Sequence, residues 1–192
     1  MSVFTSPSSL LFMRYGATTL NAAGLRCGGD VDLPLAELGL RQSAQAAQQL
    51  AALRPRVGVI VVSALQRTRQ TADIVSQALR GIEIVIEPAF NERRLGEWNR
   101  RPIAETQAEL AAGVTPPGGE SNAEFTQRIG DAVTATLLPL LGQRALLIAS
   151  KGVARVLGEL ADRGPSEPLD NAGIVAFDLS VLVQRSRMEC AA

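Results

Sequence analysis

Five short, nearly uninterrupted apolar segments recur along this 192-residue chain, and stretches with a helical pattern separate them. Strands with one solvated face alternate apolar and polar residues, whereas continuous apolar runs are typical of strands buried on both faces. We therefore expect buried strands at residues 9–13, 57–62, 82–86, 144–149 and 173–179.

The intervals between these segments carry the periodicity of helices. Leu40, Ala44, Ala47 and Ala51 fall on one face of a helix over about residues 36–53. We expect further helices at residues 67–80, from near Pro102, from about Asn122 (with Ser121 or Asn122 as the cap) to the LLPLL segment, and after Gly152. Alternating strands and helices predict a three-layer α/β/α sandwich with a mainly parallel central sheet.

Charge balance and hydropathy exclude several classes of partner. Nineteen basic and nineteen acidic side chains cancel, so no global field attracts nucleic acid or an anionic membrane. No apolar run approaches the roughly 20 residues of a membrane span, and the N-terminal segment lacks the basic region of a signal peptide. We expect a cytoplasmic protein with no nucleic-acid or membrane partner, in which any anion site is local.

The chain contains no histidine and only two cysteines, Cys27 and Cys190, which lie far apart in the sequence. This composition favours neither a zinc cluster nor a disulfide framework, so we expect no metal and no cofactor. Histidine is also the side chain most often used for proton transfer near neutral pH. Its absence narrows the chemistry that the chain can perform.

Polar side chains follow four of the predicted strands. They are Arg14 after the first strand, Arg67 with its neighbour Arg69 after the second, Glu92 after the third, and the segment SKGVAR after the fourth. Because the carboxyl ends of parallel strands meet at one edge of a sheet, these loops can share one pocket. Arginine matches phosphate or carboxylate oxygens, and a carboxyl group there could act as a general acid or base. The alternatives are solvated arginines and a surface ion pair between Glu92 and Arg93 or Arg94.

A series of short motifs adds to this pattern. They are Arg14-Tyr15-Gly16 with Thr18 and Asn21; Gly29, Asp32, Pro34-Leu35 and Gly39; SALQRTRQTA at 63–72; Asn91, Glu92, Gly96 and Trp98; Gly118-Gly119-Glu120-Ser121; and Lys151-Gly152-Val153 with Arg155. In this order they resemble the histidine phosphatase superfamily, also called phosphoglycerate-mutase-like. The resemblance implies that residues 1–192 form one domain of that type, with a covering excursion at about 95–121.

The resemblance also assigns roles to individual positions. It implies that Arg14, Asn21 and Arg67 bind the phosphoryl group and that Glu92 is the proton donor. Tyr15 stands where the family has its nucleophilic histidine. Ser150 stands at the second histidine position, unless a one-residue deletion places Lys151 there instead.

Tyrosine is a poor replacement for that nucleophile. A neutral imidazole attacks phosphorus at pH 7, whereas a phenol with a pKa of about 10 is protonated and has no histidine to act as its base. Tyr15 is also expected to project into the space of the phosphoryl group. The leading hypothesis is therefore a protein without phosphohistidine-based activity that binds a small phosphorylated or carboxylated ligand or has a regulatory role.

Two alternatives stay open. One is an enzyme with rebuilt chemistry that uses Glu92 with Tyr15 or Ser150, or Cys27 as the nucleophile, although an inert thiol is the favoured interpretation of Cys27. The other is a protein-interaction scaffold to which Trp98 and Phe125 contribute, although core or loop packing is favoured for both. The sequence does not identify the ligand. It also leaves the oligomeric state open, and a homo-oligomer is one of the possible states.

Overall fold

The apolar segments pair into one five-stranded sheet in the computed structural model, which describes residues 9–161 and 169–189. The strands are β1 (Ser9–Arg14), β2 (Val59–Val62), β3 (Ile84–Ile86), β4 (Ala145–Ala149) and β5 (Ile174–Asp178). Their order is β3-β2-β4-β1-β5, and only β5 runs antiparallel to its neighbour. The predicted mainly parallel sheet is confirmed.

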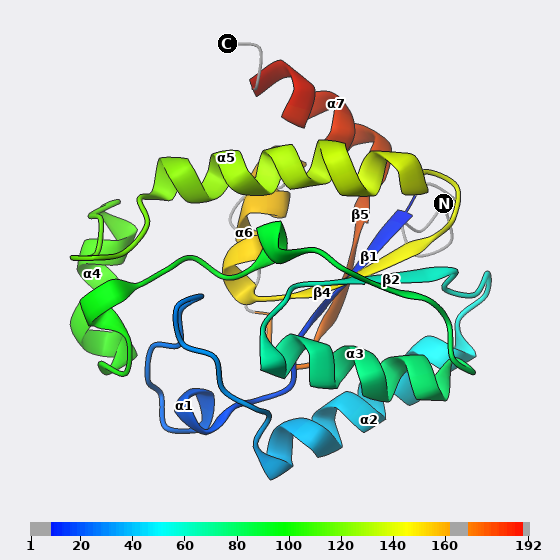
Figure 1. Ribbon diagram of the computed structural model, residues 1–192, viewed down its shortest axis with the longest axis horizontal. Helices are drawn as coiled ribbons and strands as arrows, with labels where there is room; N and C mark the ends of the chain where they lie inside the picture. Colours follow the sequence, from blue (N-terminus) through cyan, green and yellow to red (C-terminus); the bar gives the residue numbers. More distant parts are fainter. Residues whose placement is uncertain (1–8, 162–168, 190–192) are drawn as a thin grey trace.

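Successive side chains of β1 supply the cores on both faces of the sheet. Leu10 and Phe12 pack with α5 (Asn122–Ala132), α6 (Lys151–Leu160) and α7 (Leu179–Glu189), whereas Leu11 and Met13 pack with α2 (Glu37–Ala52) and α3 (Gln66–Ala78). Both faces of the strand are buried, as its uninterrupted apolar sequence predicts. Figure 1 shows the resulting three layers, with the sheet between the two groups of helices.

Two helices were not expected from the sequence. The four-residue helix α1 (Thr19–Ala22) begins at a capping box in which Thr18 and Asn21 bond reciprocally, a local arrangement too short to leave a periodic pattern. Helix α7 begins at Leu179 directly after β5, so strand and helix read as one apolar run. No helix in the described part of the chain is long and apolar enough to cross a membrane.

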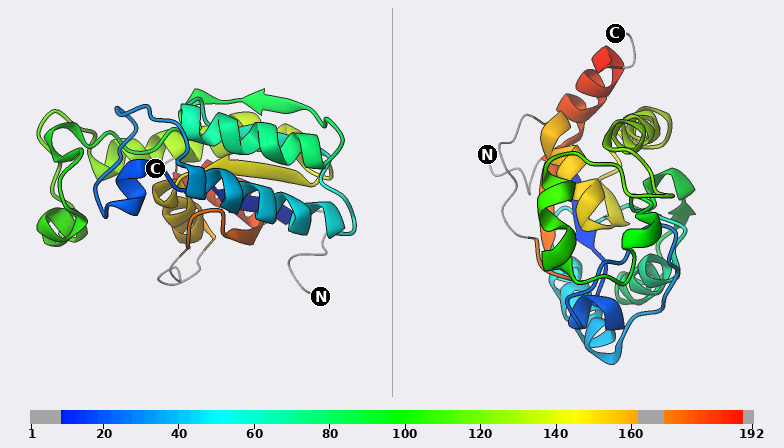
Figure 2. Two further views of the ribbon diagram at one scale, coloured as in Figure 1. Left: turned by 90° about the horizontal axis from the view of Figure 1, so that it is seen from below. Right: turned by 90° about the vertical axis from the view of Figure 1, so that its left-hand side faces the viewer.

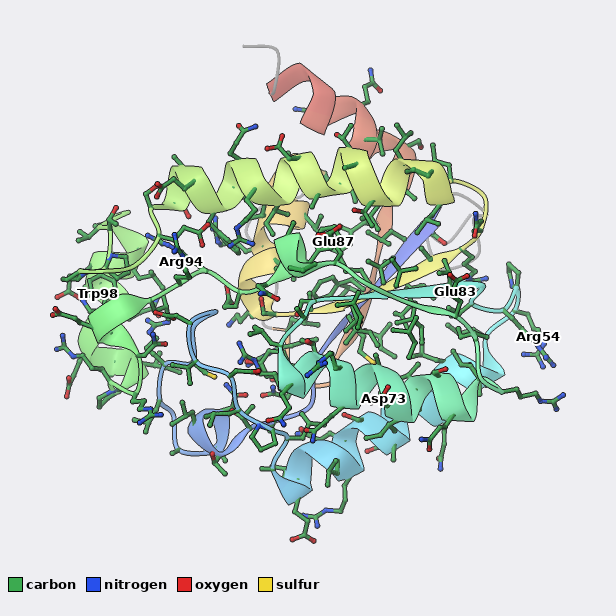
Figure 3. All side chains as sticks on the ribbon, viewed as in Figure 1. Arg54, Asp73, Glu83, Glu87, Arg94 and Trp98 are labelled. Carbon is green, nitrogen blue, oxygen red and sulfur yellow. The ribbon has the colours of Figure 1, made fainter. Side chains whose placement is uncertain are left out.

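The excursion at 95–121 lies beyond the carboxyl ends of the strands, at one end of the molecule (Figures 1 and 2). It contains a 3-10 turn (Gly96–Trp98) and α4 (Ile103–Ala111). The carboxylate of Glu120 accepts hydrogen bonds of 3.0 and 2.7 Å from Arg128 and anchors the end of the excursion to α5. Trp98, labelled at this end in Figure 3, and Phe125 are both buried: Phe125 belongs to a hydrophobic core, whereas Trp98 lies in the 3-10 turn of the excursion, outside both cores.

The buried face of α2 is offset from the predicted one. Its buried residues are Gly39, Ser43, Ala46, Ala47 and Leu50, whereas Leu40 is 43% exposed and Ala44 is exposed as well. The small residues form this face because the helix approaches other backbone closely. A Cβ added to Gly39 would lie 2.1 Å from the carbonyl oxygen of Ala17.

The close approach at Gly39 predicts opposite effects for two Gly→Ala substitutions in helices. Alanine favours a helix interior by up to about 1 kcal/mol, so Gly130→Ala in α5, where a Cβ meets no atom within 4 Å, should stabilise the protein. Gly39→Ala should instead cost about 1–3 kcal/mol, because backbone must move. Urea denaturation measures both, and equal effects would contradict the packing described for α2.

Candidate functional site

A cavity of about 700 Å³ lies beyond the carboxyl ends of β1 and β4, where ligands bind in sheets of this kind. Four of the predicted site residues line it: Arg14, Tyr15, Asn21 and Glu92. The other two, Arg67 and Ser150, are buried and do not line the cavity. A second cavity of about 370 Å³ beside β3 contains none of them.

The Tyr15 ring is packed against the two arginines that the sequence assigned to an anion. The guanidinium carbon of Arg67 lies 4.9 Å from the centroid of the ring, and that of Arg14 lies 5.9 Å from it. Only 3% of Tyr15 is exposed. Burial raises the pKa of the Tyr15 hydroxyl, although the positive charge of Arg67 opposes the shift. The phenol is therefore neutral at physiological pH.

Arg67 is held by the backbone of a neighbouring loop. Its terminal nitrogens donate hydrogen bonds of 2.8 Å to the carbonyl of Val31 and 3.1 Å to that of Gly28, and the residue is fully buried. These two donors are already used within the protein. Arg69, the alternative considered from the sequence, is exposed.

Three buried polar atoms near Tyr15 have no hydrogen-bond partner among the described residues. They are the Nε atoms of Arg14 and Arg67 and the hydroxyl oxygen of Ser150. The pairing of β1 with β4 brings Ser150 next to Tyr15, because the Tyr15 amide donates a hydrogen bond of 3.1 Å to the carbonyl of Ala149. A terminal nitrogen of Arg14 also donates a hydrogen bond of 2.7 Å to the carbonyl of Leu169. Each arginine thus has both satisfied and unsatisfied donors.

Glu92 sits at the N-terminus of α6. Its carboxylate accepts hydrogen bonds of 3.1 Å from the amide of Gly152 and 2.7 Å from that of Arg93. A Cβ added to Gly152 would lie 2.1 Å from Glu92 Oε1, so glycine is required for this contact. Among the described residues Glu92 forms no ion pair with Arg93 or Arg94, and the Arg93 side chain donates a hydrogen bond of 2.7 Å to the carbonyl of Glu120.

Asn21 and Cys27 line the cavity but take part in local contacts. The side-chain oxygen of Asn21 accepts hydrogen bonds from the amide and hydroxyl of Thr18, 3.1 and 3.0 Å away, and so caps the N-terminus of α1. Burial raises the pKa of the Cys27 thiol, and Arg67 and Thr18 only partly oppose that effect. A thiol with a raised pKa is a weak nucleophile, as expected for Cys27. Cys190 lies outside the described residues.

Basic residues to which the sequence assigned no role in anion binding complete the cavity. Arg26, Arg93, Lys151 and Arg155 all line it, and with Arg14 they outnumber the lining carboxylates. Lys151 and Arg155 are spaced by one helical turn in α6, a signal visible in the segment SKGVAR. Within the described ranges no three acidic, cysteine or histidine side chains are grouped to hold a metal ion.

The family comparison agrees with this fold and with the order of the motifs. The sequence profile of the histidine phosphatase superfamily (branch 1) matches residues 10–187. The chain belongs to the histidine phosphatase superfamily. It is 36% identical over 153 residues to the probable phosphoglycerate mutase GpmB of Cronobacter sakazakii (strain ATCC BAA-894), covering 74% of this chain and 68% of that protein. The Yersinia pestis (strain Pestoides F) protein of the same name is 34% identical over 152 residues, with the same coverage.

Solved structures of other proteins share this architecture. The mycobacterial glucosyl-3-phosphoglycerate phosphatase in complex with VO3 superposes with a TM-score of 0.71 at 26% identity, over 88% of this chain and 90% of that one. A putative alpha-ribazole-5'-P phosphatase from Escherichia coli K-12 MG1655 gives a TM-score of 0.72 at 24% identity, over 88% of each chain. The phosphoglycerate-mutase-like fold expected from the sequence is confirmed.

The buried state of Tyr15 can be measured directly, because it is the only tyrosine in the sequence. Tyrosinate absorbance at 295 nm should titrate above the ordinary pKa of about 10 in the folded protein and near 10 in urea. The folded state then holds the proton more tightly than the unfolded state, so the free energy of unfolding should fall as the pH rises above about 10.

Tyr15→Phe is the matched control for this titration. It should abolish the absorbance change and remove the part of the alkaline destabilisation that comes from Tyr15. A phenol that ionises below about pH 10 in the folded protein would contradict the burial and packing described for the ring.

Proposed function

We propose that this protein is a degenerate member of its superfamily that binds a small phosphorylated or carboxylated ligand and does not turn it over through a phosphohistidine. One observation carries the proposal. Tyr15, which occupies the position of the nucleophilic histidine in the motif, is buried against Arg67 and has a raised pKa. The chain has no histidine to replace it from elsewhere.

The chemistry of the neighbouring groups supports the loss of phosphoryl transfer. Nucleophilic catalysis needs a nucleophile that is activated by a base or by a lowered pKa. The pKa values of Tyr15 and Cys27 are both raised by burial, which favours their protonated forms. Ser150, which we place at the second histidine position, has no partner among the described residues that could accept its proton. These features also disfavour the alternative of an enzyme with rebuilt chemistry.

The cavity retains groups suited to an anion. Arg14 presents a buried Nε that has no partner among the described residues, and Lys151 adds positive charge from α6. The terminal nitrogens of Arg67 bind carbonyl groups, and those of Arg155 bind Glu159 and Asn122. We therefore assign anion binding chiefly to Arg14 and Lys151. The names of similar proteins refer to phosphorylated compounds, and one of their solved structures is a complex with the oxyanion VO3. A regulatory role and a cytoplasmic location stay predictions.

Anion binding without turnover should be visible in one thermal-shift screen of inorganic phosphate, vanadate and phosphorylated metabolites. A ligand at about 100 times its dissociation constant should stabilise the protein by about 2.7 kcal/mol. Lys151→Ala should weaken the shift. Arg69→Ala should not, because Arg69 is exposed and lines the other cavity. Hydrolysis of the same phosphate esters, followed in parallel, should be no faster with the protein than in buffer alone.

Two results would contradict the proposal. The first is the lack of any shift with all of these anions. The second is phosphatase turnover that disappears in Tyr15→Phe, since that would make Tyr15 a working nucleophile.

A further inference from the structure

Helix α4 turns its apolar side chains toward the cavity instead of toward a core. Thr106 is its only buried residue, and α4 contributes to neither hydrophobic core. An amphipathic helix ordinarily places its apolar stripe on the protein interior. Here Ile103, Leu110 and Ala111, spaced as one face of a helix, line the cavity.

Polar contacts from a single arginine position this helix. Arg26 Nε donates a hydrogen bond of 2.8 Å to the hydroxyl of Thr106. A terminal nitrogen of Arg26 donates hydrogen bonds of 3.0 Å to the Gln107 side chain and 3.3 Å to the carbonyl of Ile103. A β-bridge between Leu25 and Pro102 joins the same two segments. The apolar wall is therefore held in place by polar contacts, and none of its residues belongs to either hydrophobic core.

The two sides of the cavity thus differ in chemistry. The α6 side carries Lys151 and the ion pair of Arg155 with Glu159, whereas the α4 side carries Ile103 and Leu110, with Leu25 from the adjoining loop. A cavity of about 700 Å³ with these linings is in the size range of sites for metabolite-sized ligands. Aliphatic side chains that face such a cavity gain free energy when a ligand covers them and removes them from water.

We infer that the ligand is an amphiphilic anion: a phosphorylated or carboxylated head group joined to an aliphatic body of several carbons. The head group lies against the basic residues of α6, and the body lies against α4. The inference rests on the proposed function for the head group, and it adds the class of compound that the second wall selects. Specificity thus comes from the excursion at 95–121, while the anion site comes from the strand ends.

A homologous series of n-alkyl phosphates, from methyl to hexyl phosphate, tests this inference by isothermal titration calorimetry. Affinity should rise by up to about fourfold for each added methylene, the factor that corresponds to the burial of one CH2 group. 1-Hexanol, which has the same chain without the charge, should bind much more weakly than hexyl phosphate.

Variants then assign the chain-length dependence to α4. Ile103→Asn/Leu110→Asn should flatten it and leave the affinity for methyl phosphate unchanged. Val114→Asn is the matched control, because Val114 is 44% exposed, close to the 40% of Ile103, and does not line the cavity. It should keep the full dependence.

The outcomes separate this inference from the proposed function. Equal affinity for methyl and hexyl phosphate would overturn the apolar body while the anion site stands. An unchanged chain-length dependence in the double variant would overturn the role of α4. Failure of every alkyl phosphate to bind, or binding of hexanol as tight as that of hexyl phosphate, would overturn the proposed function and the inference together.

Discussion

The arrangement of the site depends on how the buried guanidinium of Arg67 is satisfied. A charge that leaves water is costly unless it is paired or hydrogen-bonded. Here α3 supplies the arginine, the carbonyls of Gly28 and Val31 accept its terminal N–H groups, and the face of Tyr15 covers it at 4.9 Å. The contact therefore ties together the end of β1, the loop that follows α1 and the start of α3.

In the proposed function, this packing separates reactivity from anion binding. The ring of Tyr15 lies among the arginines and has a structural role there. At the edge of the cavity Lys151 comes from α6, whose first turn is held by the carboxylate of Glu92 through the amide of Gly152. The proposed loss of reactivity at the centre and the proposed binding at the edge are compatible, because different elements supply them.

The sequence predicted the sheet well because buried parallel strands leave continuous apolar runs. It placed Arg14 and Tyr15 beside the cavity because they lie at the end of β1, and Glu92 because it lies in the segment that follows β3. It could not predict features set by tertiary contacts. The buried face of α2 follows from the approach of Gly39 to Ala17, which no periodicity reveals. Likewise, the hydrogen bonds of Arg67 depend on a loop about 40 residues away in sequence, whose path local patterns do not determine.

The central claim is that the fold and the anion site are retained while the nucleophile is lost. Phosphatase turnover of the wild type beside Tyr15→His/Ser150→His tests it most directly, with Tyr15→His/Lys151→His as the matched control. We predict no turnover by the wild type or the control, and at least about 100-fold more by the first double variant, the scale of a restored acid–base catalyst. Turnover by the wild type equal to that of the double variant would contradict the account.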